Sequence, residues 1–267
     1  MSNLKGKVAA VFAAAGTISG SVAQAFARHG AKVYVSGRDL KKVTAIADNI
    51  RRMGGKAIPV KADALEESEI DWFFEQIMAE EERLDIVFNG IGIPGGEYGT
   101  NTPAIDMSFT QFVRGFEALC GSQFLTSRAA AKCMIATGSQ GTILTLTAAL
   151  SRGKFPNASG YATASTAVEG LTRSLAAEFG SYGIRVICLN ATALPETERI
   201  RESFRKYAQQ AGVSPEDIAA GVAQQNILTG GITLSHVAET AAFLVSDDGI
   251  TFNSHIVDVD GGRFTVI

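Results

Sequence analysis

Cysteine and histidine are scarce in this chain, which has three of each among its 267 residues. Cys120, Cys133 and Cys188 are far apart and odd in number, as is typical of reduced thiols that pack as small hydrophobic side chains. The histidines show no metal-ligand spacing with one another or with the cysteines. The sequence therefore predicts neither a disulfide framework nor a metal site.

Charged residues make up only 19% of the chain. The 24 Lys and Arg nearly balance the 27 Asp and Glu, which leaves a net charge of −3. No basic run is available to follow a phosphate backbone, which argues against nucleic acid as a partner. Residues 8–27 carry no charge, but Gly16, Thr17, Ser19 and other polar residues dilute this stretch too much for a membrane span. We interpret it as a buried strand and a helix, not a secretory signal, and expect a cytoplasmic protein without a membrane partner.

The sequence is rich in short apolar runs that alternate with longer amphipathic segments. Strands are predicted at 8–12, 32–36, 57–61, 85–89, 141–146, 185–190 and 255–259. Helices are predicted at 21–29, 40–53, 68–81, 109–137 (as one helix or two), 159–179 and 234–245. Repeated strand–helix units indicate an α/β fold with a doubly wound parallel sheet of about seven strands and helices on both faces. Residues 1–267 are read as one domain, with a polar, partly helical segment at about 195–230.

Several motifs occur in an order and spacing that resemble the short-chain dehydrogenase/reductase family over essentially the whole chain. These are Asp63, the run Asp85–Gly92 (DIVFNGIG), Tyr161 with its small-residue helix, Gly183–Val186 and Val259–Gly262. The resemblance implies a Rossmann fold, a nicotinamide dinucleotide, a small-molecule substrate and a homodimer or homotetramer. It also implies that the segment at 195–230 shapes the substrate pocket.

The family has three glycines between its first strand and first helix, where they cradle the dinucleotide pyrophosphate. Ala13, Thr17 and Ser19 fall at these places, while Gly16 and Gly20 are displaced from them. One interpretation is a tolerant loop in which the Thr17 or Ser19 hydroxyl donates to phosphate at the helix N-terminus. The other is a plain strand-to-helix turn whose added side-chain atoms crowd the phosphate.

The end of the second strand bears on the choice of cofactor. Gly37 occupies the place where an acidic residue would favour NAD, and Arg38 follows it. Arginine binds phosphate bidentately, so this pattern favours NADP, although a solvated arginine at a loop is common. Asp39 is predicted to cap the next helix. The resemblance adds further cofactor-binding positions at Ile18, Asp63, Asn89, Gly90 and Leu194.

The family's catalytic tetrad of Asn, Ser, Tyr and Lys is reduced to one member. Alignment places Leu119 at the Asn position, Ala148 at the Ser position and Ser165 at the Lys position, and only Tyr161 is retained. The lost serine would hold the substrate carbonyl, and the loss of such a donor costs about 10²–10³ in rate. Carbonyl reduction, in which Tyr161 acts as a neutral acid, suffers less than alcohol oxidation.

Neighbouring residues offer substitutes for the missing groups. Hydroxyls come from Thr147, Ser151, Thr163 and Ser165, and the missing charge could come from Arg152 or Lys154, unless these two are only exposed loop cations. After the sixth strand, Ala191-Thr192 replaces the family's Pro-Gly. Phe112, Phe116 and Phe124 on the central helix are read either as core or as part of an oligomer interface.

Two functions are consistent with these residues. The first is an NADP-linked oxidoreductase that reduces a small carbonyl compound through a non-standard site. The second is a non-redox homologue with weak or no dinucleotide binding, either a ligand-binding or regulatory protein or a lyase or cyclase that uses Tyr161 as an acid.

Overall fold

The computed structural model describes residues 2–93, 95–229 and 231–263. Met1 and residues 264–267 at the two ends of the predicted domain lie outside the described residues, as do Pro94 and Gly230, the last residue of the predicted segment. Within the described part, no helix combines the length and the apolar character needed to cross a membrane.

Seven parallel strands form one sheet in the order β3-β2-β1-β4-β5-β6-β7. The strands are β1 (Val8–Phe12), β2 (Lys32–Gly37), β3 (Lys56–Lys61), β4 (Ile86–Asn89), β5 (Thr142–Ala148), β6 (Arg185–Ala191) and β7 (Ile256–Val259). All five residues of β1 and all seven of β6 are buried, as expected of central strands covered on both faces. The predicted doubly wound parallel sheet is confirmed.

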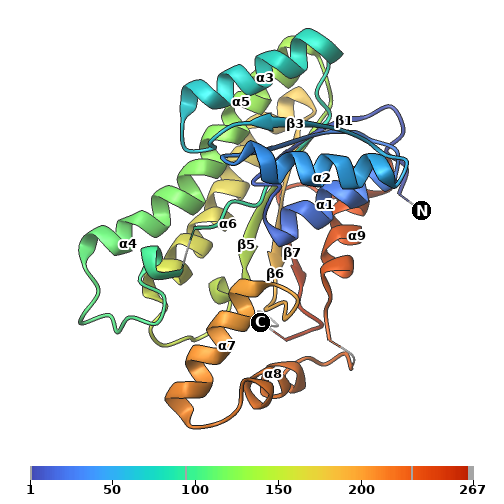
Figure 1. The fold of residues 1–267 in the computed structure, drawn as a ribbon. Helices are drawn as coiled ribbons and strands as arrows, with labels where there is room; N and C mark the ends of the chain where they lie inside the picture. Colours follow the sequence, from blue (N-terminus) through green and yellow to red (C-terminus); the bar gives the residue numbers. More distant parts are fainter. Residues whose placement is uncertain (1, 94, 230, 264–267) are drawn as a thin grey trace.

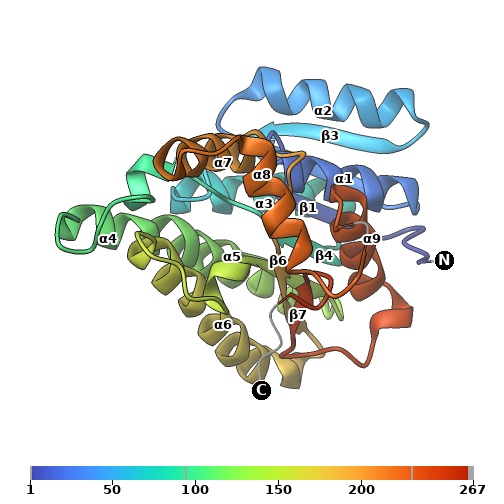
Figure 2. The ribbon, with the colours of Figure 1, turned by 90° about the horizontal axis from the view of Figure 1, so that it is seen from below.

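Helices cover both faces of this sheet (Figures 1 and 2). The helices are α1 (Thr17–Arg28), α2 (Leu40–Arg52), α3 (Glu67–Glu81), α4 (Phe109–Phe116), α5 (Ser122–Thr137), α6 (Ser159–Phe179), α7 (Glu198–Ala211), α8 (Pro215–Gln224) and α9 (Leu234–Val245). One apolar core lies between the sheet and α1, α2 and α9, and another lies between the sheet and α3, α5 and α6.

The segment 109–137, predicted as one helix or two, consists of two α-helices joined by a π-helical turn. A π-helical turn, Glu117–Gly121, joins α4 to α5 without a break and contains the buried Leu119. Helix α1 begins four residues before its predicted start, because extended Gly16 leads directly into it.

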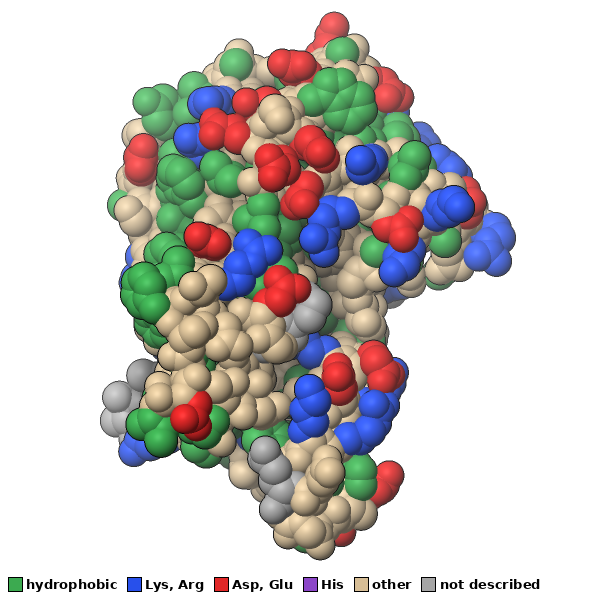
Figure 3. Space-filling model, turned by 60° about the vertical axis from the view of Figure 1, so that its left-hand side comes forward, with side chains coloured by type: hydrophobic (Ala, Val, Ile, Leu, Met, Phe, Trp, Pro, Cys, Tyr) green, Lys and Arg blue, Asp and Glu red, His purple; other side chains and the backbone are tan. Residues whose placement is uncertain are grey.

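Two helices of the predicted polar segment form a lobe beyond the carboxyl ends of the strands (Figure 1). Thr197 caps α7 with its side chain, and Ser214 forms a capping box with Asp217 at the start of α8. Figure 3 shows this lobe projecting below the body, with side chains of opposite charge gathered together above its tip. Ion pairs from Glu198 to Arg201 and Arg205 contribute to that charged surface.

Candidate active site

Tyr161 lies in the first turn of α6, as predicted, and is partly buried. Its ring packs against that of Tyr98, with 4.9 Å between the centroids and a tilt of 32° between the planes. Tyr98 belongs to the short 3₁₀ helix Gly95–Tyr98, which lies in the loop after β4. The loop after β4 therefore supplies a ring neighbour to Tyr161.

Tyr98 is fully buried, and two glycines leave room for it. A Cβ on Gly160 would lie 2.7 Å from the Tyr98 carbonyl oxygen, and a Cβ on Gly115 would lie 3.2 Å from its ring. The Ile93 amide donates a 2.5 Å hydrogen bond to the Tyr98 hydroxyl. Burial raises the pKa of Tyr98, and so does the nearby Tyr161, while the charge of Arg199 opposes both. This ring therefore forms a fixed wall for Tyr161.

Arg199 at the start of α7 brings a positive charge to the pair of rings. Its guanidinium carbon lies 4.5 Å from the centroid of Tyr161 and 4.9 Å from that of Tyr98, within cation–π range. Burial lowers the pKa of Arg199, but its attraction to the two tyrosines and its hydrogen bonding with them outweigh that effect and raise it. The guanidinium is therefore charged at any physiological pH.

Sequence reasoning missed both Arg199 and Tyr98. Arg199, Ser203 and Tyr207 are spaced four apart and share a partly buried side of α7, away from the exposed side that carries Arg201 and Arg205. An arginine on the less polar side of a predicted helix was the available signal. Its approach to Tyr161 depends on how the lobe is placed, which local spacing does not encode.

The strand-to-helix loop after β1 keeps the backbone shape expected of a glycine loop. Ala13 adopts a left-handed φ of 53°, the conformation for which glycine is normally required. Helix α1 has no side-chain cap at Gly16 and no acidic residue in its first turn, so its first amides are open to an anion. Ala13, the exposed Thr17 and the partly buried Ile18 surround this opening.

Ser19 does not crowd the opening. Its side chain is 1 % exposed, and its hydroxyl lies against Gly90, where a Cβ would come within 2.2 Å of the Ser19 oxygen. The hydroxyl has no hydrogen-bond partner among the described residues. The residues present therefore fit a pyrophosphate at the start of α1, with Thr17 as the hydroxyl that faces outward.

A family model described as enoyl-(acyl carrier protein) reductase matches residues 13–263. The chain belongs to the short-chain dehydrogenase/reductase family. Borneol dehydrogenase, mitochondrial, from Lavandula x intermedia is 31% identical over 265 residues, covering 97% of this chain and 91% of that protein. (+)-cis,trans-Nepetalactol synthase NEPS1 from Nepeta racemosa is 28% identical over 262 residues, with coverage of 97% and 91%.

Solved structures agree with this assignment. A 7α-hydroxysteroid dehydrogenase in complex with NADH and 7-oxo glycochenodeoxycholic acid matches with a TM-score of 0.84 and 28% identity, covering 97% of this chain and 95% of that one. Sorbitol-6-phosphate 2-dehydrogenase SrlD from Erwinia amylovora matches with a TM-score of 0.90 at 24% identity, with coverage of 97% and 100%, and supports the fold alone. Members of the family bind nicotinamide dinucleotides.

The other three residues predicted at tetrad positions lie at the end of β5, in the π turn and on α6. Ala148 ends β5 and pairs with Ala191 on β6, and Leu119 is buried in the π turn. Ser165 is 1 % exposed, and its hydroxyl has no partner among the described residues. Thr147 donates a 2.8 Å hydrogen bond to the Ser165 carbonyl oxygen, so its hydroxyl is engaged with the backbone of α6.

Of the two loop cations, Arg152 differs from an exposed loop cation and Lys154 does not. Arg152 is mostly buried, and its Nε lies 3.4 Å from Glu169 and 3.6 Å from Asp258. Two carboxylates therefore neutralise it, and it is not an exposed loop cation. Lys154 is exposed. Neither contacts Tyr161 in any interaction of the described residues, whereas Arg199 does.

Among the remaining candidate hydroxyls, Ser151 has a buried oxygen without a partner in the described part of the chain, and Thr163 is exposed. Thr192, after β6, is 7 % exposed, and its hydroxyl oxygen has no partner there either. None of these three hydroxyls is shown to approach Tyr161, so the structure supports no serine substitute at Ala148.

The predicted adenosine contacts lie at the ends of β2 and β3. Arg38 is exposed directly after β2. The Asp39 carboxylate accepts hydrogen bonds from the amides of Lys41 and Lys42, which confirms the predicted cap of α2. Asp63 is partly buried, and one of its carboxylate oxygens accepts the Leu65 amide.

Asn89, Gly90 and Leu194 carry structural contacts. The Asn89 side chain donates to Thr126 on α5 at 2.9 Å and accepts the Ile91 amide at 2.9 Å, which fixes the turn after β4. Gly90 leaves room for Ser19. Leu194 is buried, and its carbonyl oxygen accepts the amide and the hydroxyl of Thr197. These contacts hold the carboxyl edge of the sheet in shape.

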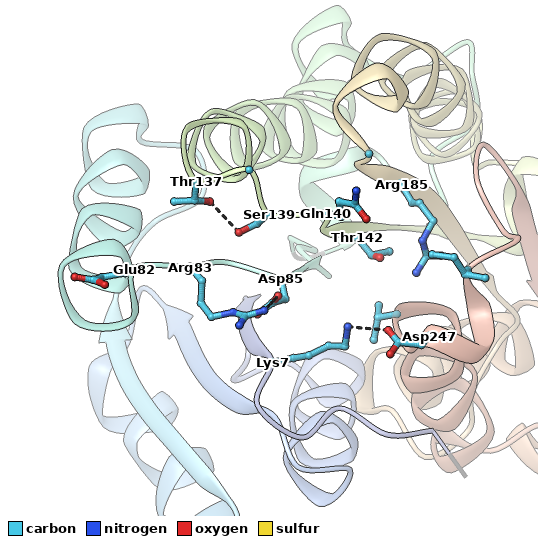
Figure 4. A pocket seen from close by; sticks show the side chains of 14 residues that line it. Lys7, Glu82, Arg83, Asp85, Thr137, Ser139, Gln140, Thr142, Arg185 and Asp247 are labelled. Carbon is cyan, nitrogen blue, oxygen red and sulfur yellow. Dashed lines mark hydrogen bonds and ion pairs between the residues drawn. The ribbon is translucent and has the colours of Figure 1, made fainter.

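A polar cavity of about 490 Å³ lies at the opposite, amino-terminal edge of the sheet (Figure 4). Most of its charged residues are already engaged. Lys7 pairs with Asp247 at 2.9 Å, Asp85 accepts the Val8 amide, and Arg185 donates to three backbone carbonyls. This cavity joins the beginnings of the strands and is remote from Tyr161. In the described part of the chain, no group of His, Cys, Asp or Glu side chains is arranged to hold a metal.

The phenylalanines of the central helix are not core residues. Phe112, Phe116 and Phe124 are 37%, 48% and 40% exposed, and Phe109 one turn earlier is 79% exposed. The interpretation as ordinary core is therefore wrong for these side chains. The three cysteines are free, as predicted, and Cys120 and Cys188 are buried.

Proposed function

We propose that this protein is an NADP-linked oxidoreductase that reduces a small carbonyl compound, with Tyr161 as the proton donor. The observation that carries the proposal is the Arg199 guanidinium 4.5 Å from the Tyr161 ring. Arg199 places a positive charge beside Tyr161, where the family's lysine is predicted to be missing. A fixed positive charge beside the reacting groups stabilises negative charge that develops on oxygen in the transition state.

In the proposed reaction, Tyr161 donates a hydrogen bond to the substrate carbonyl oxygen and then transfers its hydroxyl proton to it. NADPH, when bound, supplies the hydride for the carbonyl carbon. Tyr98 holds the Tyr161 ring in place from one side. Because Ala148 offers no hydroxyl to the carbonyl, we expect a rate about 10²–10³ below that of a site with this donor.

The open start of α1 supports a dinucleotide seat formed by Ala13, Thr17 and Ile18, with Ser19 packed behind it. Arg38 is exposed at the end of β2 with no acidic residue in front of it, which favours the extra phosphate of NADP. We propose further that Asp63 contacts the adenine, and that Asn89, Gly90 and Leu194 line the nucleotide through their backbone atoms.

A second candidate is a non-redox member that uses Tyr161 as an acid. Two observations favour it. Leu119, Ala148 and Ser165 stand at the three positions predicted for the missing tetrad members, and a relative at 28% identity carries the name nepetalactol synthase. In this version the dinucleotide binds weakly or not at all, and the protein acts as a cyclase or lyase, or as a ligand-binding protein.

Calorimetry with NADPH and NADH, together with NADPH oxidation in the presence of a panel of ketones and aldehydes, separates these functions. Reduction with saturable NADPH binding supports the first, and Tyr161→Phe should then abolish reduction and leave nucleotide affinity within about twofold. Failure of both nucleotides at millimolar concentration removes it.

We propose that the described helices at 198–224, within the predicted segment at about 195–230, close over the substrate. The exposed phenylalanines of α4 and α5 are the proposed contact of a homodimer or homotetramer. The cytoplasm is the proposed location.

A further inference from the structure

We propose that Arg199 recognises an anionic group, a carboxylate or a phosphate, carried by the ligand of this site. For the reaction, the inference rests on the proposed function, because it then names the substrate as an anionic carbonyl compound. The binding itself requires only that Arg199 and Tyr161 line one site.

The first argument is that Arg199 lacks a counter-charge. Among the described residues no carboxylate forms an ion pair with it, although Arg201 and Arg205 on the same helix both pair with Glu198. Glu198 is adjacent in sequence, yet it serves the exposed side of α7. The helix therefore neutralises its solvent-facing arginines and leaves unpaired the one that faces the active site.

The second argument is the cost of that arrangement. A guanidinium partly removed from water is unfavourable unless an opposite charge compensates it. Tyr98 and Tyr161 contribute ring faces and hydroxyls, which hold the guanidinium but do not cancel its charge. An anionic ligand would complete the pair, and arginine presents a planar fork that suits carboxylate or phosphate.

The third argument is the rigid placement of the fork. Arg199 rests on two rings whose centroids are 4.9 Å apart, and Tyr98 is itself fixed by the Ile93 amide. One guanidinium nitrogen would come within 3.3 Å of a Cβ at Gly92, so the absence of a side chain there leaves space beside the fork. Because the guanidinium is already held in place, little side-chain entropy is lost when a ligand binds, which favours affinity.

The position also restricts the ligand. Because Arg199 contacts the ring of the proposed proton donor, a bound anion and the reacting oxygen lie on neighbouring parts of one small molecule. The substrate class is therefore a carbonyl compound with a carboxylate or phosphate a few bonds from the carbonyl carbon.

Binding is tested first with unreactive probes that do or do not carry the anionic group. Calorimetry compares pentanoate with pentanamide, and glycerol 3-phosphate with glycerol, so that the two anion sources are distinguished. We expect at least one anion to bind about tenfold more tightly than its neutral partner, and Arg199→Gln to remove that advantage. Arg201→Gln, two residues later on the exposed side, is the matched control and should keep it.

Arg199→Lys keeps the charge and loses the planar fork, so it should recover only part of the affinity. Circular dichroism and urea unfolding establish that each variant is folded. Equal binding of anion and neutral partner in the wild-type protein overturns the inference, as does an anion preference that survives Arg199→Gln.

Turnover with NADPH then compares 4-oxopentanoate with its methyl ester, and dihydroxyacetone phosphate with dihydroxyacetone. Arg199→Gln should lower kcat/KM for the charged substrate by about tenfold more than for its neutral partner. An equal loss for both would mean that Arg199 acts only on Tyr161, which contradicts the inference and leaves the proposed function standing. Arg199-dependent anion binding without reduction of any carbonyl compound would support the inference and count against the proposed function.

Discussion

Ser19 and Gly90 occupy one space between the first helix and the fourth strand, since a Cβ on Gly90 would lie 2.2 Å from the Ser19 hydroxyl oxygen. Ser19 is predicted to stand at one of the family's glycine positions, and its hydroxyl is buried without a partner among the described residues. The serine is therefore accommodated by the missing side chain across from it, and the two positions are coupled.

This coupling predicts the result of a double-mutant cycle. Ser19→Ala removes an unpartnered buried hydroxyl, so we expect stability unchanged or increased by up to about 1 kcal/mol. Gly90→Ala should destabilise the wild-type protein by about 1–3 kcal/mol through overpacking. In the Ser19→Ala background the same change should cost at least about 1 kcal/mol less, although Phe88 remains close. Urea unfolding of the four proteins measures the cycle, and strict additivity would contradict the contact.

Arg38 should decide between the two nucleotides. If it binds the extra phosphate of NADP, Arg38→Ala removes a charge-assisted hydrogen bond and should raise the Kd for NADPH by about 10–100-fold. The Kd for NADH should change by less than about threefold, because NADH carries no group there. Calorimetry with both nucleotides gives these values. Arg51→Ala, an exposed arginine on α2 that pairs with Asp48, is the matched control. Equal weakening of both nucleotides would exclude a phosphate-specific role.

Restoring two tetrad residues should increase carbonyl reduction. Ala148→Ser supplies the missing hydroxyl at the end of β5, and Ser165→Lys places an ammonium one helical turn after Tyr161. With NADPH bound, the double variant should reduce simple ketones at least about tenfold faster than wild type. Ala148→Ser with Thr166→Lys, which places the lysine on the exposed side of α6, is the control. No gain despite nucleotide binding would mean that Tyr161 is not placed as an acid.

Cys188 should make the protein sensitive to alkali. Burial raises the pKa of its thiol to about 12, whereas an unfolded thiol ionises near pH 8.5. Because the folded pKa is the higher one, the contribution to stability is complete below about pH 8.5 and declines as pH rises toward 12. Wild type should therefore lose more stability than Cys188→Ala between pH 8 and pH 10.5, by up to about 2–3 kcal/mol. Urea unfolding with a reductant at both pH values measures this, and parallel losses would contradict it.

The parts of this molecule that sequence predicted well are those set by local patterns. Buried apolar runs such as Val8–Phe12 gave the strands, and the Asp39 cap depends on amides only two and three residues away. Tyr161 was placed correctly because its helix has a regular small-residue face. The outer bounds of the central helical segment, 109–137, were also predicted, whereas the start of α1 was placed four residues too late.

The site itself could be predicted only in part, because its decisive contact joins residues 38 positions apart on different elements. Arg199 reaches Tyr161 through the placement of α7 over the strand ends. The same limitation made Arg152 look like an available cation, since its partners Glu169 and Asp258 come from α6 and β7. Pairings of this kind follow from tertiary packing and leave no local spacing in the sequence.

Ala13 has a consequence for how such a site changes over time. Its left-handed backbone costs about 1–2 kcal/mol relative to an unstrained residue, and glycine would remove this cost. Glycine would also loosen the unfolded chain, which gives back about 0.4–1 kcal/mol. The exchange in either direction is thus small beside the 5–15 kcal/mol that hold a typical domain together. A single exchange between alanine and glycine at position 13 therefore leaves the fold intact in either direction.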